Sequence, residues 1–388
     1  MKICGIIAEY DPFHNGHAWH MKEARRITNA DCIVCVISGS FTQRGMPALL
    51  PAHARSAMAL DAGADIVLQL PVSFSVCNAE RFALGGVSVL SRLGASSLCF
   101  GAETEGIPCI EKAAGLLENP TDTLQDAIKK RLQSGVGFPR AQGEALAEAL
   151  GTRNDVLALP NTSLAIAYAR ANIRLNAGLT LHPVCRSGNY HDAAIPDDGS
   201  LPSATAVRAA MLSGDWMRVK QSVPSFSYEM LTRLWKEGDC HAPGALDDML
   251  RFQLRVRTDF SRIPDLSEGI ENRFAKAADC LTREEMIASI KSKRYPYARI
   301  SRMLTHILLD TDKTQISPLP QYAYILGFRK EASALLRLPS DGGFSLFSTA
   351  DPQDRSYDMS LDARADDLWA LGAKRPFGAL YRSKPFVL

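Results

Sequence analysis

The sequence predicts an α/β protein in which a doubly wound parallel sheet is followed by a mainly helical C-terminal domain. Over residues 1 to about 105, short and almost continuously apolar runs alternate with helical patterns. Strands that are apolar along their whole length must be covered on both faces, and the helices between them supply the crossovers of a parallel sheet. After about residue 215 this alternation stops and helical patterns dominate. The 388 residues are therefore expected to form two domains, 1–215 and 216–388.

The elements of the first domain can be placed in order from these patterns. Strands are expected at residues 2–10, 31–39, 65–72 and 96–103, and helices at 17–28, 53–62 and 78–93. A mainly helical stretch at 107–176 leads to a fifth strand at 179–186, and the second domain ends in a mixed tail from about 310 that can contain strands. Because ligands bind at the carboxyl ends of strands in such sheets, the segments after Ala8, Ser38 and Phe100 are candidate sites.

The composition is that of a soluble globular protein, with 46% hydrophobic and 22% charged residues. Its 44 Lys and Arg against 42 Asp and Glu give a net charge of +2, so any nucleic-acid site must be local. The first apolar run ends at Glu9, too soon for a signal-peptide core, and no apolar run approaches the ~20 residues of a membrane span. We therefore expect a cytoplasmic protein with no membrane contact.

The nine cysteines are expected to be reduced, because their number is odd and several lie inside apolar strands. Cys32 and Cys35 have the spacing of a redox or zinc site. A strand would point them to opposite faces, however, so we interpret both as structural.

The loop after the first strand carries the strongest chemical signal. It delivers two imidazoles, His14 and His17, to the start of a helix, with Gly16 between them. The free N–H groups and positive dipole end of a helix favour phosphate, and glycine permits close backbone approach. Nucleotidyl transfer requires mainly that a protein stabilise charge on the transferring group, and two imidazole donors suit that task. The loop therefore predicts a phosphate-binding site.

Two plainer interpretations of these histidines are weaker. A single His at a helix start is usually a cap or a solvated residue, but here two occur together with a glycine and a preceding strand. His14, His17 and His20 could be taken as zinc ligands, yet no Cys or carboxylate follows at ligand spacing. We therefore expect no metal site formed by the protein itself.

Further polar groups are expected at other strand ends and helix starts. Arg44, in the loop after the second strand, could meet a phosphate or carboxylate. Gly101, at the end of the fourth strand, would let an adenine or ribose pack against backbone. A second polyphosphate cradle is predicted where a helix begins at Ser203 or Thr205, with an Arg one turn further on. These additional candidates are Asn161 at a helix start, Arg186 at the end of the fifth strand, and the phosphate-binding set Ser203, Thr205 and Arg208.

Taken together, these segments resemble the tRNA(Met) cytidine acetate ligases, a family whose Rossmann-like sheet is of the nucleotidylyltransferase type with an HxGH motif. The resemblance extends over residues 1 to about 328. Where the family commonly has Asn, this chain has Asp11. The motifs that carry the resemblance are, in order, EYDPFHNGH, SGSFTQRGMPAL, GADIVLQLP, FGAE, LPNTSLAIAY, YHD, SATAVR and KSKRYPYARISRMLTHILL.

The resemblance implies a two-step ligase reaction. Acetate and ATP give acetyl-adenylate and pyrophosphate, and the exocyclic amine of the wobble cytidine in elongator tRNA(Met) then takes the acetyl group, giving N(4)-acetylcytidine. The catalytic residues would be His14, His17 and Arg44, assisted by a magnesium ion. By the same resemblance, the ATP contacts would be Ile7, Ala8, Glu9, Tyr10, Asp11, Pro12, Phe13, His14, Asn15, Gly16, His17, Ala18, Trp19, His20, Gly101, Asn161 and Arg186.

The second step requires an RNA-binding surface, for which the segment 291–302 is the candidate. It has five basic residues, no acidic residue and two interleaved tyrosines. Basic side chains can follow phosphates while aromatic rings stack on unpaired bases, such as those of an anticodon loop. The predicted tRNA contacts are Lys291, Lys293, Arg294, Tyr295, Arg299 and Arg302.

Two other functions remain open at this point. Another adenylyltransferase acting on a small metabolite would share the HxGH loop, but it would have no use for the long segment that ends in basic and aromatic residues. A non-catalytic nucleotide sensor or RNA-binding scaffold is disfavoured because both His14 and His17 are present.

Overall fold

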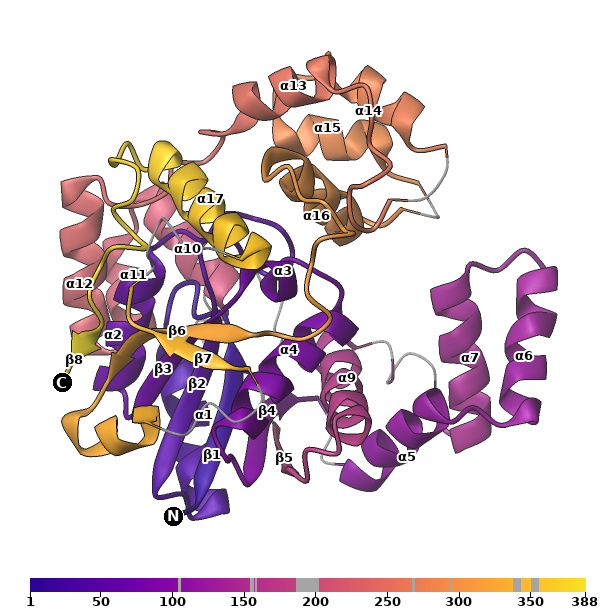
Figure 1. Cartoon of the computed structure of the whole chain (residues 1–388), viewed down its shortest axis with the longest axis horizontal. Coiled ribbons are helices and arrows are strands. Elements are labelled where there is room, and N and C mark those ends of the chain that lie inside the picture. The colour runs from indigo at the N-terminus through magenta and orange to yellow at the C-terminus, as the bar shows by residue number, and fades with distance from the viewer. Residues whose placement is uncertain are drawn as a thin grey trace.

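A mostly parallel sheet forms the centre of the molecule, and helices cover both of its faces (Figure 1). The computed structural model describes residues 1–103, 106–153, 157, 159–185, 202–266, 269–292, 295–337, 343–349 and 356–388. In this part of the chain the sheet has eight strands in the order β5-β4-β1-β2-β3-β6-β7, with β8 beside β6. The strands are β1 (Ile3–Ala8), β2 (Cys32–Ser38), β3 (Ile66–Leu70), β4 (Ser97–Ala102), β5 (Thr180–Cys185), β6 (Tyr322–Phe328), β7 (Ser345–Phe347) and β8 (Phe386–Val387).

The helices fall into three groups along the chain. Those connecting β1 to β5 are α1 (Asn15–Thr28), α2 (Ala52–Asp61), α3 (Val72–Ser75), α4 (Ala79–Arg92), α5 (Ile107–Glu118), α6 (Asp122–Gln133), α7 (Phe138–Leu150) and α9 (Pro160–Arg174). Those between β5 and β6 are α10 (Ala204–Ser213), α11 (Trp216–Ser222), α12 (Ser225–Glu237), α13 (Asp247–Val256), α14 (Glu271–Ala277), α15 (Arg283–Ile290) and α16 (Tyr297–Leu308). The last group is a 3-10 helix (Lys330–Arg337) and α17 (Tyr357–Gly372).

The predicted doubly wound sheet is confirmed. Strands β1 to β5 pair in parallel, as expected from their continuous apolar runs. Successive residues of β2 point to opposite faces: Val34 and Val36 pack in the core that includes α4 and α9, whereas Ile33 and Ile37 pack in the core that includes α1 and α2. A strand that is buried on both faces requires this arrangement.

The strand order places a topological switch point at β1. The chain adds β2 and β3 on one side of β1 and then crosses to add β4 on the other side. The loops that leave β1 and β4 therefore diverge at their carboxyl ends and open a crevice, which is where open α/β sheets bind ligands.

The CxxC cysteines are structural, as expected. Cys32 lies in the core on one face of the sheet and Cys35 in the core on the other. Burial raises the pKa of both thiols to about 12, so neither is a thiolate near neutral pH. All nine cysteines are free.

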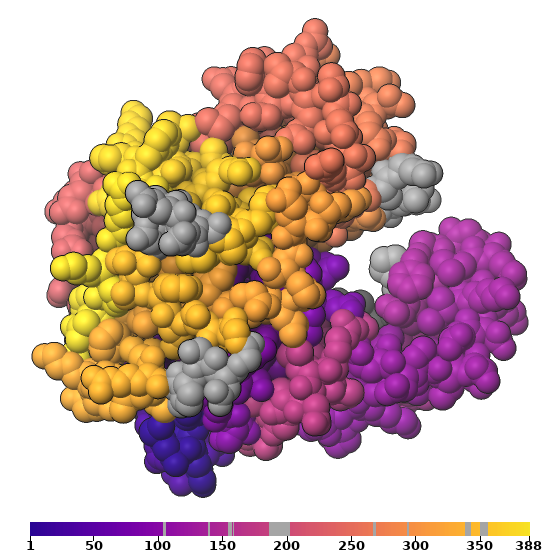
Figure 2. All heavy atoms as spheres, viewed as in Figure 1, coloured from indigo at the N-terminus to yellow at the C-terminus, as the bar shows by residue number. Residues whose placement is uncertain are grey.

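The insertion between β4 and β5 extends away from the sheet. Its helices α6 and α7 pair with each other and project as a hairpin (Figure 1). The space-filling view shows an open hollow between this hairpin and the helices α13 to α16 (Figure 2). Helices α13 to α16 have a hydrophobic core of their own, into which residues of α3 and α17 also pack.

The expected boundary at 215/216 needs one correction. The C-terminal tail returns to the first domain, because β6 pairs antiparallel with β3 and then carries β7 and β8. Without β6, the buried and apolar β3 would be an exposed sheet edge with unpaired backbone groups. Residues 216–388 are thus a helical insertion followed by strands of the common sheet. No helix in the described ranges is long and apolar enough to cross a membrane.

Candidate active site

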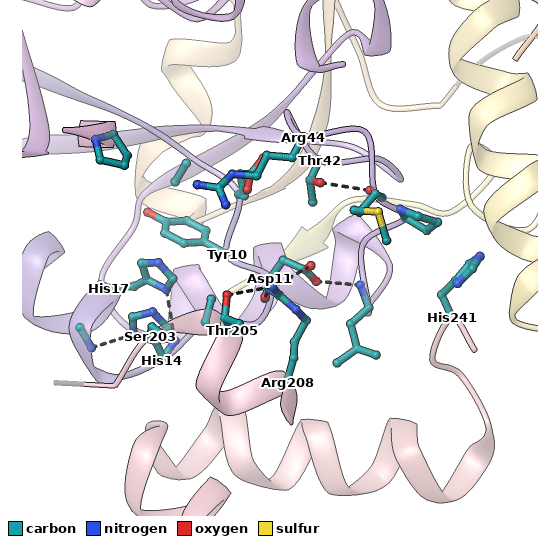
Figure 3. Close-up of a pocket in the computed structure, with 18 of the residues that line it drawn as sticks. Tyr10, Asp11, His14, His17, Thr42, Arg44, Ser203, Thr205, Arg208 and His241 are labelled. Carbon is teal, nitrogen blue, oxygen red and sulfur yellow. Dashed lines mark hydrogen bonds and ion pairs between the residues drawn. The ribbon is translucent and has the colours of Figure 1, made fainter. Parts of the chain in front are cut away.

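A cavity of about 550 Å³ opens where β1, β2 and β4 end (Figure 3). We call the lining residues of β1, α1, β4, α9 and α10, together with the β1–α1 loop, the strand-end wall. The lining residues 241–247, Arg283 and Glu284 form a second part, which we call the helical wall. The β2–α2 loop, which contributes Thr42, Arg44 and Leu49 among others, contacts both walls.

Most of the predicted nucleotide residues line this cavity. They are Ile7, Ala8, Glu9, Tyr10, Asp11, His14, Gly16, His17, Trp19, His20, Arg44, Gly101, Asn161, Ser203, Thr205 and Arg208. Four others of the predicted set, Pro12, Phe13, Asn15 and Ala18, are not among the lining residues and lie in the supporting loop and helix. Arg186 lies outside the residues that the structure describes.

His14 and His17 cap helix α1, which begins at Asn15 and therefore earlier than expected. Nδ1 of His14 accepts a hydrogen bond from the Gly16 N–H (3.0 Å), and Nδ1 of His17 accepts one from the His14 N–H (3.3 Å). The two rings are stacked with their centroids 3.7 Å apart. A ring nitrogen that accepts a hydrogen bond carries no proton, so in each neutral ring the proton is on Nε2. Both imidazoles line the cavity, and each carries an N–H group that is a hydrogen-bond donor.

A second helix start, that of α10, faces the same cavity. Ser203 is its N-cap and accepts a hydrogen bond from the Ala206 N–H (3.0 Å). One turn further on, Arg208 donates to the backbone oxygen of Asp11, and its Nη2 donates to Thr205 Oγ1 (3.2 Å). The positive dipole ends of α1 and α10 therefore converge on one space, together with a guanidinium that is held in place.

The carboxylate of Asp11 is engaged by the protein. Its Oδ1 accepts a hydrogen bond from the Leu49 N–H (2.7 Å), and its Oδ2 lies 3.5 Å from Nη1 of Arg208. Asp11 thereby ties the β2–α2 loop to the β1–α1 loop, and Arg208 offsets its negative charge. A direct contact between Asp11 and nucleotide stays a prediction.

Arg44 is exposed at the cavity, and in the described ranges it has no hydrogen-bond or ion-pair partner. Its side chain points toward Tyr10 in Figure 3. The next residue, Gly45, anchors the loop to the helical insertion, because Nη2 of Arg283 (2.9 Å) and Oγ1 of Thr305 both donate to its carbonyl oxygen. Gly45 has φ +77°, and a Cβ there would lie 2.8 Å from the Cα of Arg302. Helices α15 and α16 therefore determine where Arg44 lies.

At the other end of the strand-end wall, Glu103 caps α9. Its carboxylate accepts hydrogen bonds from the backbone N–H groups of Asn161 (3.0 Å) and Thr162 (2.7 Å) and from Oγ1 of Thr162 (3.0 Å). Asn161 Nδ2 also donates to Glu103 (2.8 Å), which leaves Oδ1 as the acceptor of that amide. Asn161 is thus oriented by Glu103, and the capping group of this helix is a side chain that our sequence reasoning left without a role.

Arg55 is another residue that the sequence did not reveal. It is fully buried, and its guanidinium donates to the backbone oxygens of Leu50 (3.1 Å), Glu9 (2.5 Å) and Gly39. These three carbonyls belong to the segments that leave β1 and β2, so Arg55 holds the carboxyl ends of both strands together. In the sequence it reads as an ordinary helical arginine, with no motif around it.

Burial shifts the pKa of several titratable groups in the strand-end wall, among them His20 and Glu9. It lowers the pKa of His20 to about 4, so His20 is neutral at pH 7. It also raises the pKa of Glu9, whose carboxylate accepts a hydrogen bond from the Gln43 N–H (2.6 Å). The donors that a phosphate would meet are thus backbone N–H groups, imidazoles and arginines.

The predicted tRNA-binding segment requires correction. Tyr295 is 5% exposed and Arg302 is 8% exposed, so neither presents an open face for an RNA base or phosphate. Arg302 forms an ion pair with Asp265 (3.1 Å), and Arg299 donates to the Asp265 carbonyl (2.7 Å) while its guanidinium lies over the Tyr295 ring. A basic and aromatic pattern does not reveal which side chains turn inward. Lys291 is exposed, and Lys293 and Arg294 lie outside the described residues.

Comparison with known proteins gives consistent relatives along the whole chain. The HIGH Nucleotidyl Transferase family model matches residues 1–379. The tRNA(Met) cytidine acetate ligase of Fervidobacterium nodosum is 34% identical over 362 residues, which cover 90% of this chain and 84% of that protein. The tRNA(Met) cytidine acetate ligase of Kosmotoga olearia is 35% identical over 401 residues, covering 97% and 92%.

Two solved structures of TmcAL from Thermotoga maritima have the same fold. The apo crystal form matches with a TM-score of 0.91 and 28% identity, and the match covers 100% of both chains. A form bound with alpha-thio ATP matches with a TM-score of 0.87 and 27% identity, again over 100% of both chains. The present chain therefore belongs to the HIGH nucleotidyl transferase family and, within it, to the tRNA(Met) cytidine acetate ligases.

Proposed function

We propose that this protein is an ATP-dependent tRNA(Met) cytidine acetate ligase, which activates acetate and transfers the acetyl group to N4 of the wobble cytidine of elongator tRNA(Met). The observation that carries this proposal is the convergence of two helix starts, His14, His17 and Arg208 on one cavity at the switch point of the sheet. Such an arrangement suits polyphosphate binding and transfer. The relatives of this chain carry the name of this activity.

In the first step an acetate oxygen attacks the α-phosphorus of ATP. The new oxygen–phosphorus bond forms as the bond to the β-phosphate oxygen breaks, and pyrophosphate leaves with the electron pair. Negative charge grows on the phosphate oxygens during this exchange. The Nε2–H groups of His14 and His17 and the guanidinium of Arg44 would donate to these oxygens, and their preorganisation by the protein lowers the cost of reaching the transition state.

The nucleotide orientation is inferred from the helix start that a carboxylate already caps. Glu103 already neutralises the start of α9, so that end of the cavity repels phosphate and suits the adenosine moiety. There Gly101 permits close approach, and Oδ1 of Asn161 can accept from a ribose hydroxyl or the adenine amine. The phosphates would extend toward α1 and α10.

Magnesium is proposed to enter with ATP. Among the described residues, no group of three or more His, Cys, Asp and Glu could hold a metal ion. Mg²⁺ commonly keeps several waters and is bound through substrate phosphates with few protein ligands, so a magnesium site does not require such a cluster of side chains. The ion would add charge neutralisation, and the side chains named above would bind and orient the phosphates.

The tRNA would approach through the hollow between α6–α7 and α13–α16, because a long RNA needs an open path to the cavity (Figure 2). Lys291, Lys293, Arg294 and Arg299 remain the proposed contacts to the tRNA phosphates. Since ATP and tRNA are cytoplasmic substrates, we propose a cytoplasmic location.

Isotope transfer tests the proposed function. The purified protein is incubated with ATP, magnesium, labelled acetate and total tRNA, and the nucleosides are analysed by mass spectrometry. ATP-dependent label in acetylcytidine of elongator tRNA(Met) is expected. Acetate-dependent pyrophosphate exchange without this label would indicate another acceptor, and the absence of both would contradict an adenylating role.

A further inference from the structure

The helical wall has no part in the nucleotide site described above, although it lines the same cavity. It consists of residues 241–247, from the loop that leads into α13, together with Arg283 and Glu284 at the start of α15. Between His241 and Leu246 the chain carries only Ala, Pro and Gly side chains, and all four of these residues are exposed. This wall therefore leaves room for a planar ring beside it.

Three contacts show how near the helical wall is to the phosphate end of the cavity. Asp11 accepts from the Leu49 N–H (2.7 Å), and the Leu49 carbonyl in turn accepts from the His241 N–H (2.9 Å). In the same loop, Gly45 accepts from Arg283 (2.9 Å). The β2–α2 loop, which carries Arg44, is thus bonded directly to both walls.

The second reaction step places a strict demand on this geometry. The acceptor amine must reach the carbonyl carbon of an acetyl group that is joined to the α-phosphate. The base that carries the amine must therefore enter the same cavity, within one acetyl group of the phosphate site. The ATP residues occupy the strand-end wall, and the opposite wall is available for the base.

Among the described lining residues, four are carboxylates: Glu9, Asp11, Asp247 and Glu284. Glu9 and Asp11 each accept a backbone N–H of the β2–α2 loop, and Glu284 is exposed. Asp247 is half-buried in the first turn of α13. Burial raises its pKa, opposed by a hydrogen bond from the backbone N–H of Arg283. The carboxylate of Asp247 therefore binds a proton more readily than an exposed aspartate would.

We propose that the helical wall binds the cytosine base of the acceptor nucleotide and that Asp247 accepts first a hydrogen bond and then a proton from its exocyclic amine. This inference rests on the proposed function. Carboxylates are natural acceptors for the N4 amine of cytosine, and they are repelled by the O4 of uracil. As the nitrogen–carbonyl bond forms, the bond from the carbonyl carbon to the phosphate oxygen breaks. AMP leaves with the electron pair, and the amine proton passes to Asp247.

The test compares Asp247→Asn with Asp248→Asn in the full-length protein. Asn is isosteric with Asp, and its carbonyl oxygen can still accept from Arg283, but it cannot take up the proton. Asp248 is in the same helical turn, has a side chain that is 94% exposed, and is not among the lining residues, so it supplies a matched control. Acetate-dependent ATP–pyrophosphate exchange reports the first step, and transfer of labelled acetate to elongator tRNA(Met) reports the second.

For Asp247→Asn we expect pyrophosphate exchange within about two-fold of the wild-type rate and acetyl transfer lowered by about 10²-fold or more, the usual effect of losing a general base. Asp248→Asn should change neither rate. Transfer by Asp247→Asn at the wild-type rate, or an equal loss of exchange and transfer, would overturn the inference. A wild-type protein that exchanges pyrophosphate but acetylates no tRNA would instead show that the proposed function itself is wrong.

Discussion

The strand-end wall of the cavity is built around the ends of β1 and β4 and the loop and helix that follow β1, with α9 and α10 beside them. The helical wall comes from a loop and helix starts between β5 and β6. In the first wall, residues that are close in sequence, such as His14 and His17, form the site together. In the second, residues such as Asp247 and Arg283 meet only because α13 and α15 pack in one core. This difference shows that one half of a site can be predicted from a sequence motif, whereas the residues of the other half come together only in the folded protein. It also suggests that the two walls serve different steps.

The largest expected effect comes from removing an imidazole of the strand-end wall. His17→Ala should lower acetate-dependent ATP–pyrophosphate exchange by about 10²–10³-fold, because one preorganised donor to the developing charge is lost. Binding of tRNA, measured by filter retention, should not change. His182→Ala, on the outer strand β5, serves as the control. A wild-type rate of pyrophosphate exchange by His17→Ala would contradict the role of the strand-end wall in forming acetyl-adenylate.

Breaking the connection between the walls is the next largest change. Gly45→Ala places a Cβ 2.8 Å from the Cα of Arg302 at a residue with φ +77°. Strain and overpacking together should lower the free energy of unfolding by about 2–4 kcal/mol, with a lower exchange rate because Arg44 shifts. Chemical denaturation measures the first effect. Gly115→Ala is the control, since nothing lies within 4 Å of a Cβ there; equal stability of the two variants would contradict this account of the loop.

A pH-dependent effect is expected in the helical wall. Burial lowers the pKa of His241 to about 4. The ordinary pKa of histidine is 6.5, so between pH 6.5 and 4 His241 is protonated in the unfolded chain but stays neutral in the folded protein. Above pH 6.5 this group costs the folded state nothing. As the pH decreases below 6.5, the free energy of unfolding falls, and at pH 5 it is about 2 kcal/mol lower than at high pH.

The measurement is the free energy of unfolding at pH 7 and pH 5 for the wild type and for His241→Gln. The variant should be less sensitive to this change in pH, whatever its stability at pH 7. An unchanged pH dependence would show that His241 is protonated equally in both states.

A smaller effect should sharpen the assignment of the adenosine end. Glu103→Gln removes the charge that caps α9 and loosens the orientation of Asn161. Charged hydrogen bonds contribute about 1.5–3 kcal/mol, so we expect the KM for ATP to rise by about ten-fold with kcat little changed. Glu111→Gln, at an exposed position on α5, is the control. A selective loss of kcat would place Glu103 in the chemistry rather than in binding.

How far the sequence predicts this structure depends on how local each signal is. The strands β1 to β5 and the β1–α1 loop were predictable because continuous apolar runs and a single motif specify them. The pairing of β6 with β3 was not predictable. The two strands are far apart in the sequence, separated by the helical insertion, and their antiparallel pairing leaves no local pattern. The prediction that Tyr295 and Arg302 contact tRNA was wrong for a related reason. Their residue types suit RNA, but both side chains are buried in the folded protein.

The division of labour between the walls is most directly tested by a chase experiment. The protein is loaded with labelled acetate and ATP in the absence of tRNA, and elongator tRNA(Met) is then added with excess unlabelled acetate. The wild type should pass its label to cytidine, Asp247→Asn should accumulate labelled acetyl-adenylate and pass it on far more slowly, and His17→Ala should form far less of it. Transfer of only unlabelled acetate by the wild type, or passage of label by Asp247→Asn at the wild-type rate, would contradict this division.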